Sequence, residues 1–419
     1  MSSSPDLTDS ASPVWVGHTK GSAGYQRVLI ALFCAGIATF AQLYSVQGLL
    51  PMLARGLDIT AAQAALTISA ATVGLAVAVL PWSFAADRFG RVRVMGAAII
   101  AATCFGLVVP LSPDFPVLLG LRIAEGMALG AIPAVALAYL NEEVHPLYAA
   151  RAAGVYVAGT TIGGLSGRVL AVPIAELAGW RIGTLTISVL AAVAAVAFLV
   201  LAPRSRGFVP NEQGGISRVF RGMTAAVRNP HLGILYAQGF LLAGSFVSVY
   251  NYLGFRLEAA PYLLPPTAAG LIFLAYLSGT FSSRRAAVLA ERAGRRTILL
   301  GSIAIMAGGV LLTLLSPLPV VLLGLVAMTT GFFAAHSIAS GWTGSITPSG
   351  KAQASSLYNL AYYTGSSVLG WASGLVFQSV GWAVMAITLV VLVAISGAIA
   401  LAMPTATRVQ ETSMAGHSS

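Results

Sequence analysis

Arg122 and Glu125 are two charged residues inside an otherwise apolar run, in the segment LRIAEG. Residues three positions apart share one face of a helix, so the two side chains can pair. A charge in the middle of a bilayer costs about 2.5–3.5 kcal/mol, so such groups persist when they are paired or face water. A carboxyl in a partly dry cavity beside an arginine can load and release a proton. We interpret Glu125 as a candidate proton carrier paired with Arg122, and a static structural ion pair as the alternative.

Arg168 and His336 are two further polar residues inside apolar runs. Arg168 can hold an anionic substrate group or, when it is close, favour the charged form of Glu125. Its structural alternative is a set of hydrogen bonds to backbone carbonyls at a helix bend. His336 can serve as a second proton site or form a hydrogen bond with the substrate, and packing in the core is its alternative.

The composition predicts that these residues lie in a membrane. Apolar residues make up 57% of the 419 residues and charged residues only 9%, with a mean hydropathy of +0.85. Soluble domains carry about 25% charged residues, so a soluble enzyme of this size is excluded. The net charge of +10 does not indicate nucleic-acid binding, because the basic residues punctuate apolar runs instead of gathering on a polar face. Cys34 and Cys104 lie in apolar runs and predict neither a disulfide framework nor a metal site.

Twelve transmembrane helices account for the apolar residues, at about 20 residues per crossing. We predict two six-helix halves, 26–203 and 231–403, joined by a central linker, 204–230, and flanked by polar tails, 1–25 and 404–419. The first tail is Ser-rich, lacks the features of a secretory signal, and is predicted to be disordered. Placing both termini and the linker on one side collects most lysines and arginines there, so that side is predicted to be cytoplasmic. The spans are predicted near 26–50, 60–83, 94–111, 115–140, 148–172, 180–202, 231–255, 266–286, 297–315, 318–342, 353–378 and 382–403.

The two halves repeat each other at a nearly constant offset of 204 to 206 residues. TFAQLYSVQGL aligns with SFVSVYNYLGF, which places Tyr44 on Tyr250, and DRFGR aligns with ERAGR. A duplicated six-helix unit that closes around a central cavity suits alternating access. Arg122 and Arg168 have no counterpart in the repeat, which suggests function for these residues.

The central linker contains ISRVFRGMTAAVR, in which apolar residues recur at helical spacing between arginines. This pattern predicts a helix lying on the anionic inner leaflet, with a disordered linker as an equal alternative.

With these motifs in place, the chain resembles the major facilitator superfamily over nearly its whole length. The loop around Asp87, Arg88, Gly90 and Arg91 is similar to the signature GxxxDRxGRR, with Ser83 in place of the glycine and Val92 in the basic run. The resemblance implies a gating latch at this loop, repeated as Glu291, Gly294 and Arg295. A loop that is merely rich in positive charge is the alternative.

Two spans add further motifs to the resemblance, one of the superfamily and one of proton antiporters. LRIAEG is similar to the motif RxxQG with Glu125 in place of glutamine. The fifth span resembles the motif of drug and metabolite proton antiporters, with Gly164 where they usually have proline, and Gly159, Gly163 and Gly167 are spaced for close helix packing. The YnfM-like branch of bacterial exporters matches better, including Arg168 and the stretch around His336. The resemblance further implies cavity-lining positions, which makes these residues candidate substrate contacts: Tyr44, Gln47, Tyr156, Tyr250 and Asn251.

We predict a proton-coupled secondary transporter of the bacterial inner membrane, acting as a monomer and exporting small amphipathic or hydrophobic compounds. The sequence lacks HExxH, GxSxG and P-loop motifs, so neither an enzyme nor an ATP-driven pump is predicted, and the proton gradient replaces a cofactor. The expected partners are a small-molecule substrate, protons and lipid, without metal or nucleic acid. A proton-coupled carrier of organic anions is the alternative, because two buried arginines face one buried carboxylate. A solute sensor is disfavoured by the short tail 404–419.

Overall fold

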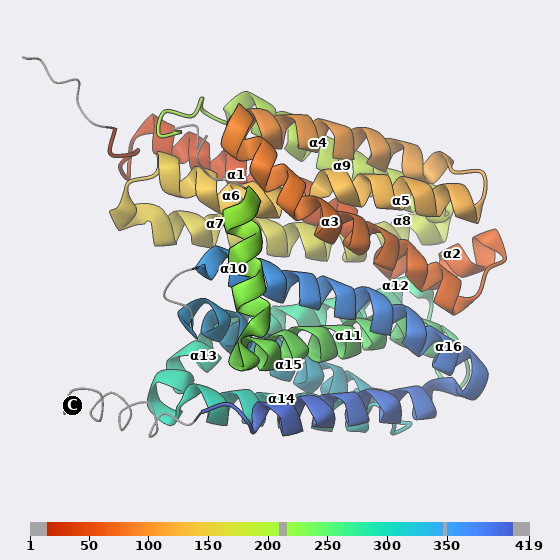
Figure 1. Cartoon of the computed structure of the whole chain (residues 1–419). Coiled ribbons are helices and arrows are strands. Elements are labelled where there is room, and N and C mark those ends of the chain that lie inside the picture. The colour runs from red at the N-terminus through yellow and green to blue at the C-terminus, as the bar shows by residue number, and fades with distance from the viewer. Residues whose placement is uncertain (1–14, 209–215, 347–349, 405–419) are drawn as a thin grey trace, which may run out of the picture.

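The computed structural model describes residues 15–208, 216–346 and 350–404, and within these residues every regular element is a helix. Figure 1 shows two bundles of roughly parallel helices, one from each half of the chain. The N-terminal bundle consists of α1 (Ala23–Leu43), η1 (Gln47–Leu49), α2 (Leu50–Leu57), α3 (Ala61–Phe89), α4 (Arg91–Val108), η2 (Val109–Leu111), α5 (Phe115–Leu129), α6 (Ala131–Glu143), α7 (Pro146–Val169), α8 (Ala171–Ala178) and α9 (Trp180–Leu201).

The C-terminal bundle follows a connecting helix, α10 (Ile216–Arg228). It consists of α11 (Pro230–Glu258), α12 (Pro266–Gly270), η3 (Leu271–Ala275), α13 (Tyr276–Ala293), α14 (Arg295–Leu312), α15 (Leu318–Ile346) and α16 (Lys351–Ala400). Gly381, with φ of 81°, interrupts the helical geometry of α16, so this one element contains both of the last two predicted spans.

The predicted spans coincide with these helices, although several crossings are broken into two pieces. By length and composition, ten segments of the described chain are long and apolar enough to cross a membrane. The predicted span 266–286 is not among them. It is divided among α12, η3 and α13, and α13 carries four charged residues, including Arg284 and Glu291.

Glycines set the turns and the closest helix contacts. Gly90 and Gly294, with φ of 96° and 84°, form the tight turns that link α3 to α4 and α13 to α14. A Cβ atom on Gly159 would lie 2.3 Å from the carbonyl oxygen of Phe33, so α1 and α7 pack backbone to backbone. Gly365 occupies the equivalent position between α16 and α11, with 2.1 Å to the carbonyl oxygen of Phe240. The internal repeat therefore includes its helix contacts.

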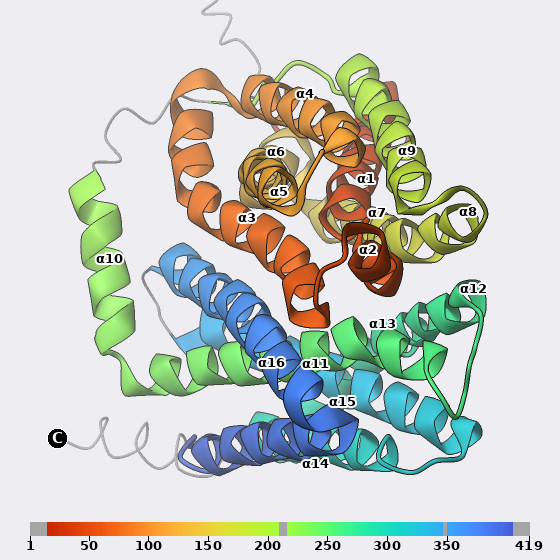
Figure 2. The ribbon, with the colours of Figure 1, turned by 90° about the vertical axis from the view of Figure 1, so that its right-hand side faces the viewer.

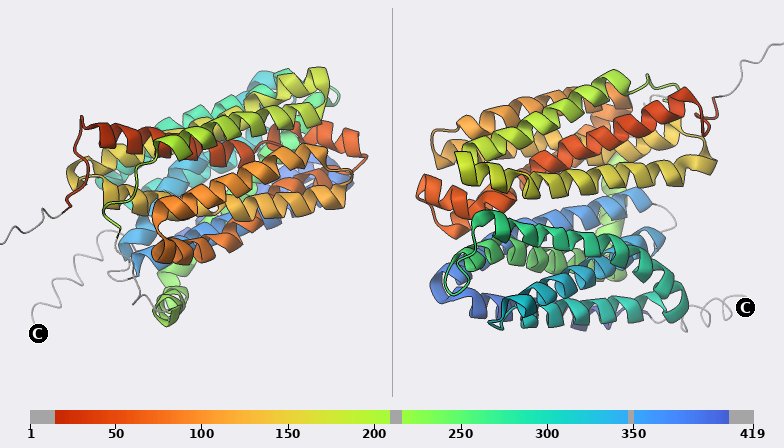
Figure 3. Two further views of the ribbon diagram at one scale, coloured as in Figure 1. Left: turned by 90° about the horizontal axis from the view of Figure 1, so that it is seen from above. Right: turned by 180° about the vertical axis from the view of Figure 1, so that it is seen from behind.

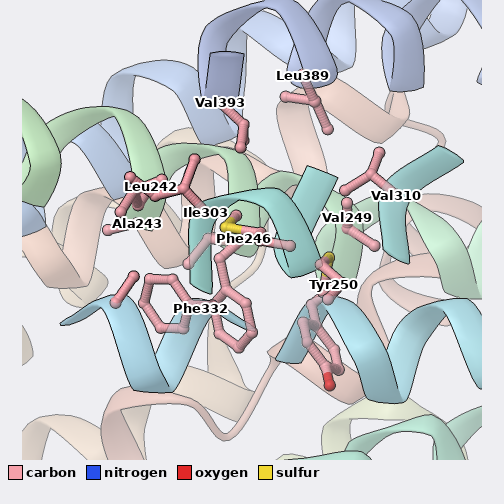
Figure 4. Close-up of a cluster of buried hydrophobic side chains, with 14 of the residues drawn as sticks. Leu242, Ala243, Phe246, Val249, Tyr250, Ile303, Val310, Phe332, Leu389 and Val393 are labelled. Carbon is pink, nitrogen blue, oxygen red and sulfur yellow. The ribbon is translucent and has the colours of Figure 1, made fainter. Parts of the chain in front are cut away.

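Each bundle has its own apolar core. In the C-terminal bundle, Phe246 of α11 stacks on Phe332 of α15 with 3.9 Å between ring centroids. Figure 4 shows Leu242, Ile303 and Leu389 around this pair. Tight packing of this kind holds helices together in lipid, where the hydrophobic effect between helices is absent.

Residues 15–22 differ from the predicted disordered tail. The backbone N–H of His18 donates to the carbonyl of Glu143, and the His145 N–H donates to the carbonyl of His18. The Trp15 indole donates to the carbonyl of Glu142 at 3.2 Å. Burial in this contact lowers the pKa of His18. The segment is therefore anchored to the loop between α6 and α7, while residues 1–14 lie outside the described part of the chain.

The central linker contains the amphipathic helix that its sequence predicts, and not a disordered segment throughout. Figure 2 shows α10 along one side of the molecule, running from the N-terminal bundle toward the C-terminal bundle. Its Met223 lines a small pocket together with Val79 of α3, Pro133 of α6 and Tyr363 of α16. Helix α10 therefore shares this pocket with residues of both halves.

Candidate functional site

A cavity of about 400 Å³ lies between the two halves. Figure 3 shows, from behind, α7 facing the segment that includes α12 and α13 across the boundary between the bundles. Rings from Phe40, Tyr44, Phe246, Tyr276, Phe333 and Tyr362 line the cavity. Its charged side chains are Arg168 and Arg284, and within the described residues its wall contains no carboxylate.

Arg168 is a buried cation on the cavity wall that is held by several partners. It is 4% exposed, its Nε donates to Oε1 of Gln47 at 2.7 Å, and its Nη1 donates to the carbonyl of Gly164 at 2.6 Å. The guanidinium carbon lies 3.9 Å from the ring centroid of Tyr44 and 4.7 Å from that of Tyr276. Aromatic faces attract a cation, so this cage stabilises the positive charge. Among the described residues, no carboxylate lies within ion-pair distance of Arg168.

Gln47 connects Arg168 to the other half of the molecule. Its Nε2 donates to Oδ1 of Asn251 on α11 at 2.8 Å. Gln47 and Asn251 lie outside the main cavity and, with Tyr250, line a separate space of about 10 Å³. The Tyr250 hydroxyl is hydrogen-bonded to Thr329 at 2.7 Å. Gln47 and Asn251 thus form a polar seam between the halves, Tyr250 bonds within its own half, and Tyr44 and Arg168 face the cavity.

Arg122 and Glu125 form a buried ion pair inside the N-terminal half. Nη1 of Arg122 donates to Oε2 of Glu125 at 2.6 Å, and the two residues are 0% and 1% exposed. The guanidinium also donates to the carbonyls of Gln42, Leu43 and Thr67. Neither member of the pair lines the main cavity. The pair is therefore enclosed by α1, α3, α4 and α5 in this conformation.

His336 and Tyr156 lie away from the cavity wall. Nδ1 of His336 lies 3.0 Å from the hydroxyl of Tyr358, and its ring stacks on Phe332 with 5.8 Å between centroids. Tyr156 is 6% exposed and, like His336, is not a lining residue. Gly164 faces Arg168, whereas Gly163 and Gly167 face the backbone of α1.

The Asp87 loop forms an ionic cluster within its own half. Nη1 of Arg91 donates to Asp87 at 2.5 Å, and the guanidinium reaches Glu142 of α6 at 3.0 Å. Arg88 lies over the ring of Phe89. In the repeat, Arg295 donates to the hydroxyl of Ser345. Glu142 is a partner that sequence reasoning missed, because its position at the end of an apolar helix gave no hint of its contact.

The halves are joined at the end opposite to Asp87. There, Nη1 of Arg55 donates to Oε2 of Glu258 at 2.7 Å, and Glu176 accepts a hydrogen bond from the backbone N–H of Thr267 at 2.9 Å. We call this the Arg55 end. Among the described residues of α1–α9 and α11–α16, the Asp87 end shows no hydrogen bond or ion pair between the halves. At the two ends of the molecule, the polar contacts between the described halves therefore lie at the Arg55 end.

Several site residues could be found only in the structure. Tyr276 and Phe273 complete the aromatic cage around Arg168, but tyrosine and phenylalanine are common packing residues in apolar helices. Gln42 is different, because a polar residue inside an apolar run is a detectable signal. Its amide lies beside Glu125, as described below.

Comparisons with known proteins identify the family. The family model described as Major Facilitator Superfamily matches residues 28–288. The inner membrane transport protein YnfM of Escherichia coli is 37% identical over 87% of each chain. The MFS-type transporter YybF of Bacillus subtilis is also 37% identical, over 90% of this chain and 93% of its own.

A solved structure shows the same fold. It is a bacterial homologue of the human lysosomal transporter Spinster, with a TM-score of 0.74 at 15% identity, and the match covers 91% of this chain and 97% of that one. The predicted all-α membrane fold is confirmed, and the relatives are transporters, not enzymes. The chain belongs to the Major Facilitator Superfamily and is a multi-pass secondary transporter similar to YnfM.

Proposed function

We propose that this transporter exports small amphipathic organic anions across the inner membrane in exchange for protons. The observation that carries the proposal is Arg168, a caged guanidinium on the cavity wall with no acidic partner among the described residues. A buried charge without a counter-ion is costly, and a bound anion would supply one. We propose that the carrier acts as a monomer, with its cavity between the two halves of one chain.

The lining of the cavity fits the rest of such a substrate. Its aromatic rings supply apolar surface for an amphipathic body, and Arg284 adds a second positive charge nearer the Asp87 end. We propose that this end and both termini face the cytoplasm, as the positive charge bias predicts. The cavity is then loaded from inside the cell.

A neutral amphipathic substrate is the second candidate. The observation that favours it is the number of aromatic rings on the wall, since stacking and apolar contact need no charge on the ligand. In that case Arg168 serves mainly to hold Gln47 and the carbonyl of Gly164.

We assign the proton to Glu125. It is a buried carboxylate in the middle of the α5–α6 crossing, paired with an arginine that has no counterpart in the repeat. Because the pair is enclosed here, protons reach it in another conformation of the cycle. Export is supported by the likeness of the α7 glycine run to the motif of proton antiporters, and His336 remains a candidate second proton site.

A matched pair of probes tests whether the cavity binds an anion. We choose 2-naphthalenesulfonate, a permanent anion, and the neutral 2-naphthalenesulfonamide, and measure their effect on thermal unfolding of the purified protein. The sulfonate is expected to stabilise the wild type and not Arg168→Gln, whereas the sulfonamide has little effect on either protein. If both probes stabilise the wild type equally, and stabilise Arg168→Gln to the same extent, the result contradicts an anionic substrate and supports a neutral one. Arg284→Gln is the control for general positive charge in the cavity.

Proton coupling is tested separately in inside-out vesicles with an acid interior, using a pH-indicating dye. Addition of 2-naphthalenesulfonate is expected to release protons from wild-type vesicles and not from Glu125→Gln vesicles. The sulfonate should still stabilise Glu125→Gln against thermal unfolding, because Arg122 and Glu125 do not line the cavity. Proton release at the wild-type rate in Glu125→Gln shows that the proton is carried elsewhere.

A further inference from the structure

The amide of Gln42 is held in one orientation beside the buried ion pair. Gln42, near the end of α1, is 1% exposed. Its Nε2 donates to the carbonyl of Ala38 at 3.0 Å, so its Oε1 must point the other way. That oxygen has no hydrogen-bond partner among the described residues. A buried amide oxygen without a donor costs free energy, so its surroundings call for explanation.

The unpartnered oxygen and the carboxyl of Glu125 face the same glycine. A Cβ atom on Gly106 of α4 would lie 2.2 Å from Oε1 of Gln42 and 3.1 Å from Oε1 of Glu125. The other carboxyl oxygen of Glu125, Oε2, is already bonded to Arg122. Gly106 thus leaves room for two oxygens that any larger residue would displace.

Two oxygens that face the same small space can share a proton when one of the two groups is protonated. A carboxylate only accepts, as does the amide oxygen, so the deprotonated form places two acceptors together. A protonated carboxyl has one O–H donor, which can be given to Gln42 while Oε2 keeps its bond from Arg122. Arg122 is the charged side chain in contact with Glu125. Gln42 of α1 and Gly106 of α4, which lie beside Glu125, and Thr67 of α3, which contacts Arg122, are uncharged.

We propose that Gln42 is a positioning residue whose amide oxygen accepts a hydrogen bond from the protonated carboxyl of Glu125. Gly106 provides the space for this contact. The inference rests on the proposed proton role of Glu125 and adds the group that makes its protonated form stable inside the protein. In the deprotonated form, repulsion between the two oxygens acts on the end of α1.

This position links the proton to the cavity through a short piece of chain. Gln42 is followed by Leu43, whose carbonyl accepts from Arg122, and by Tyr44, whose ring covers Arg168. Gln47, the partner of Arg168, starts the next helical turn. A displacement of Gln42 on loss of the proton therefore reaches the proposed anion site within a few residues.

Infrared spectroscopy of the purified, substrate-free protein tests the inference. A protonated carboxyl has its own C=O stretching band, which we expect to appear as the pH is lowered and to be absent in Glu125→Gln. In Gln42→Leu the midpoint of this band should move to lower pH by about half to one unit, a proton affinity about threefold to tenfold lower. The band should also move to higher frequency, because its O–H has lost an acceptor.

The controls separate this contact from a general loss of packing. Gln42→Asn, which shortens the amide and withdraws the oxygen, should shift the band in the same direction and is the second variant if the leucine variant does not fold. Gln238→Leu removes an equally buried amide, which lies in the C-terminal half and is bonded to Ser396, and should leave the band unchanged.

The outcomes distinguish the two proposals. If Glu125→Gln removes the band while both Gln42 variants titrate like the wild type at the same frequency, Gln42 has no such role and the proton assignment stands. If no titrating band depends on Glu125, the proton role itself is wrong, and the inference about Gln42 is overturned with it.

Discussion

At the scale of single residues, Arg122 should matter more for folding than Glu125. Arg122→Met leaves a buried carboxylate without its partner and three backbone carbonyls without their donor, a loss of about 3–5 kcal/mol. Glu125→Gln keeps an amide oxygen that can accept from Arg122, so it should cost about 1–2 kcal/mol. We expect Arg122→Met to unfold at a clearly lower temperature, measured in detergent by size-exclusion chromatography after heating.

The sequence could predict the ion pair of Arg122 and Glu125 but not the backbone carbonyls that surround it. Spacing on a helix brings Arg122 and Glu125 together from local geometry alone. The carbonyls of Gln42, Leu43 and Thr67 come from α1 and α3, and their positions depend on how the helices pack. For the same reason Gln47 and Asn251, predicted as substrate contacts, are found in a seam between the halves.

At the scale of helices, the contact between α1 and α7 should tolerate no added methyl group. Gly159→Ala places a Cβ atom 2.3 Å from a backbone oxygen of Phe33, which cannot move without shifting α1. Overpacking of this kind costs about 1–3 kcal/mol. Gly154→Ala on the same helix is the matched control, because nothing lies within 4 Å of its Cβ position. Thermal unfolding should separate the two variants, and equal melting temperatures would show that the helices are not held by this contact.

The sequence predicted the helices well where hydropathy alone determines the structure. It predicted the structure less well where contacts between segments determine it. Apolar runs are found as helices because lipid leaves the backbone no other partner for its hydrogen bonds. The anchoring of residues 15–22 was missed, since this segment pairs with the loop after α6 mainly through backbone atoms, which carry no sequence signal. The division of the span 266–286 was missed because its apolar first part resembles an unbroken helix.

At the scale of the whole molecule, the internal repeat predicted two bundles but not the end at which they are joined. Alternating access gives one sequence at least two arrangements of its halves, so no pattern of residues specifies a single one. The structure shows one of them, in which Arg55 of α2 and Glu258 of α11 join the halves at one end. Partners on two helices 203 positions apart in sequence are not visible as a motif.

Breaking the Arg55–Glu258 pair should therefore shift the balance between the two arrangements. The side chain of Arg55 is 59% exposed, so the pair contributes at most about 1 kcal/mol, and its loss shifts the equilibrium by up to about fivefold.

Thr161→Cys, in a background with Cys34 and Cys104 replaced, reports access to the cavity wall. A membrane-impermeant maleimide added on the side of the Arg55 end should label this cysteine faster in Arg55→Gln and in Glu258→Gln. The double charge reversal, Arg55→Glu with Glu258→Arg, should restore the slow rate, because it rebuilds the attraction with the same groups. Faster labelling in the double reversal as well would mean that the contact between the halves depends on the shape of these side chains and not on their charges.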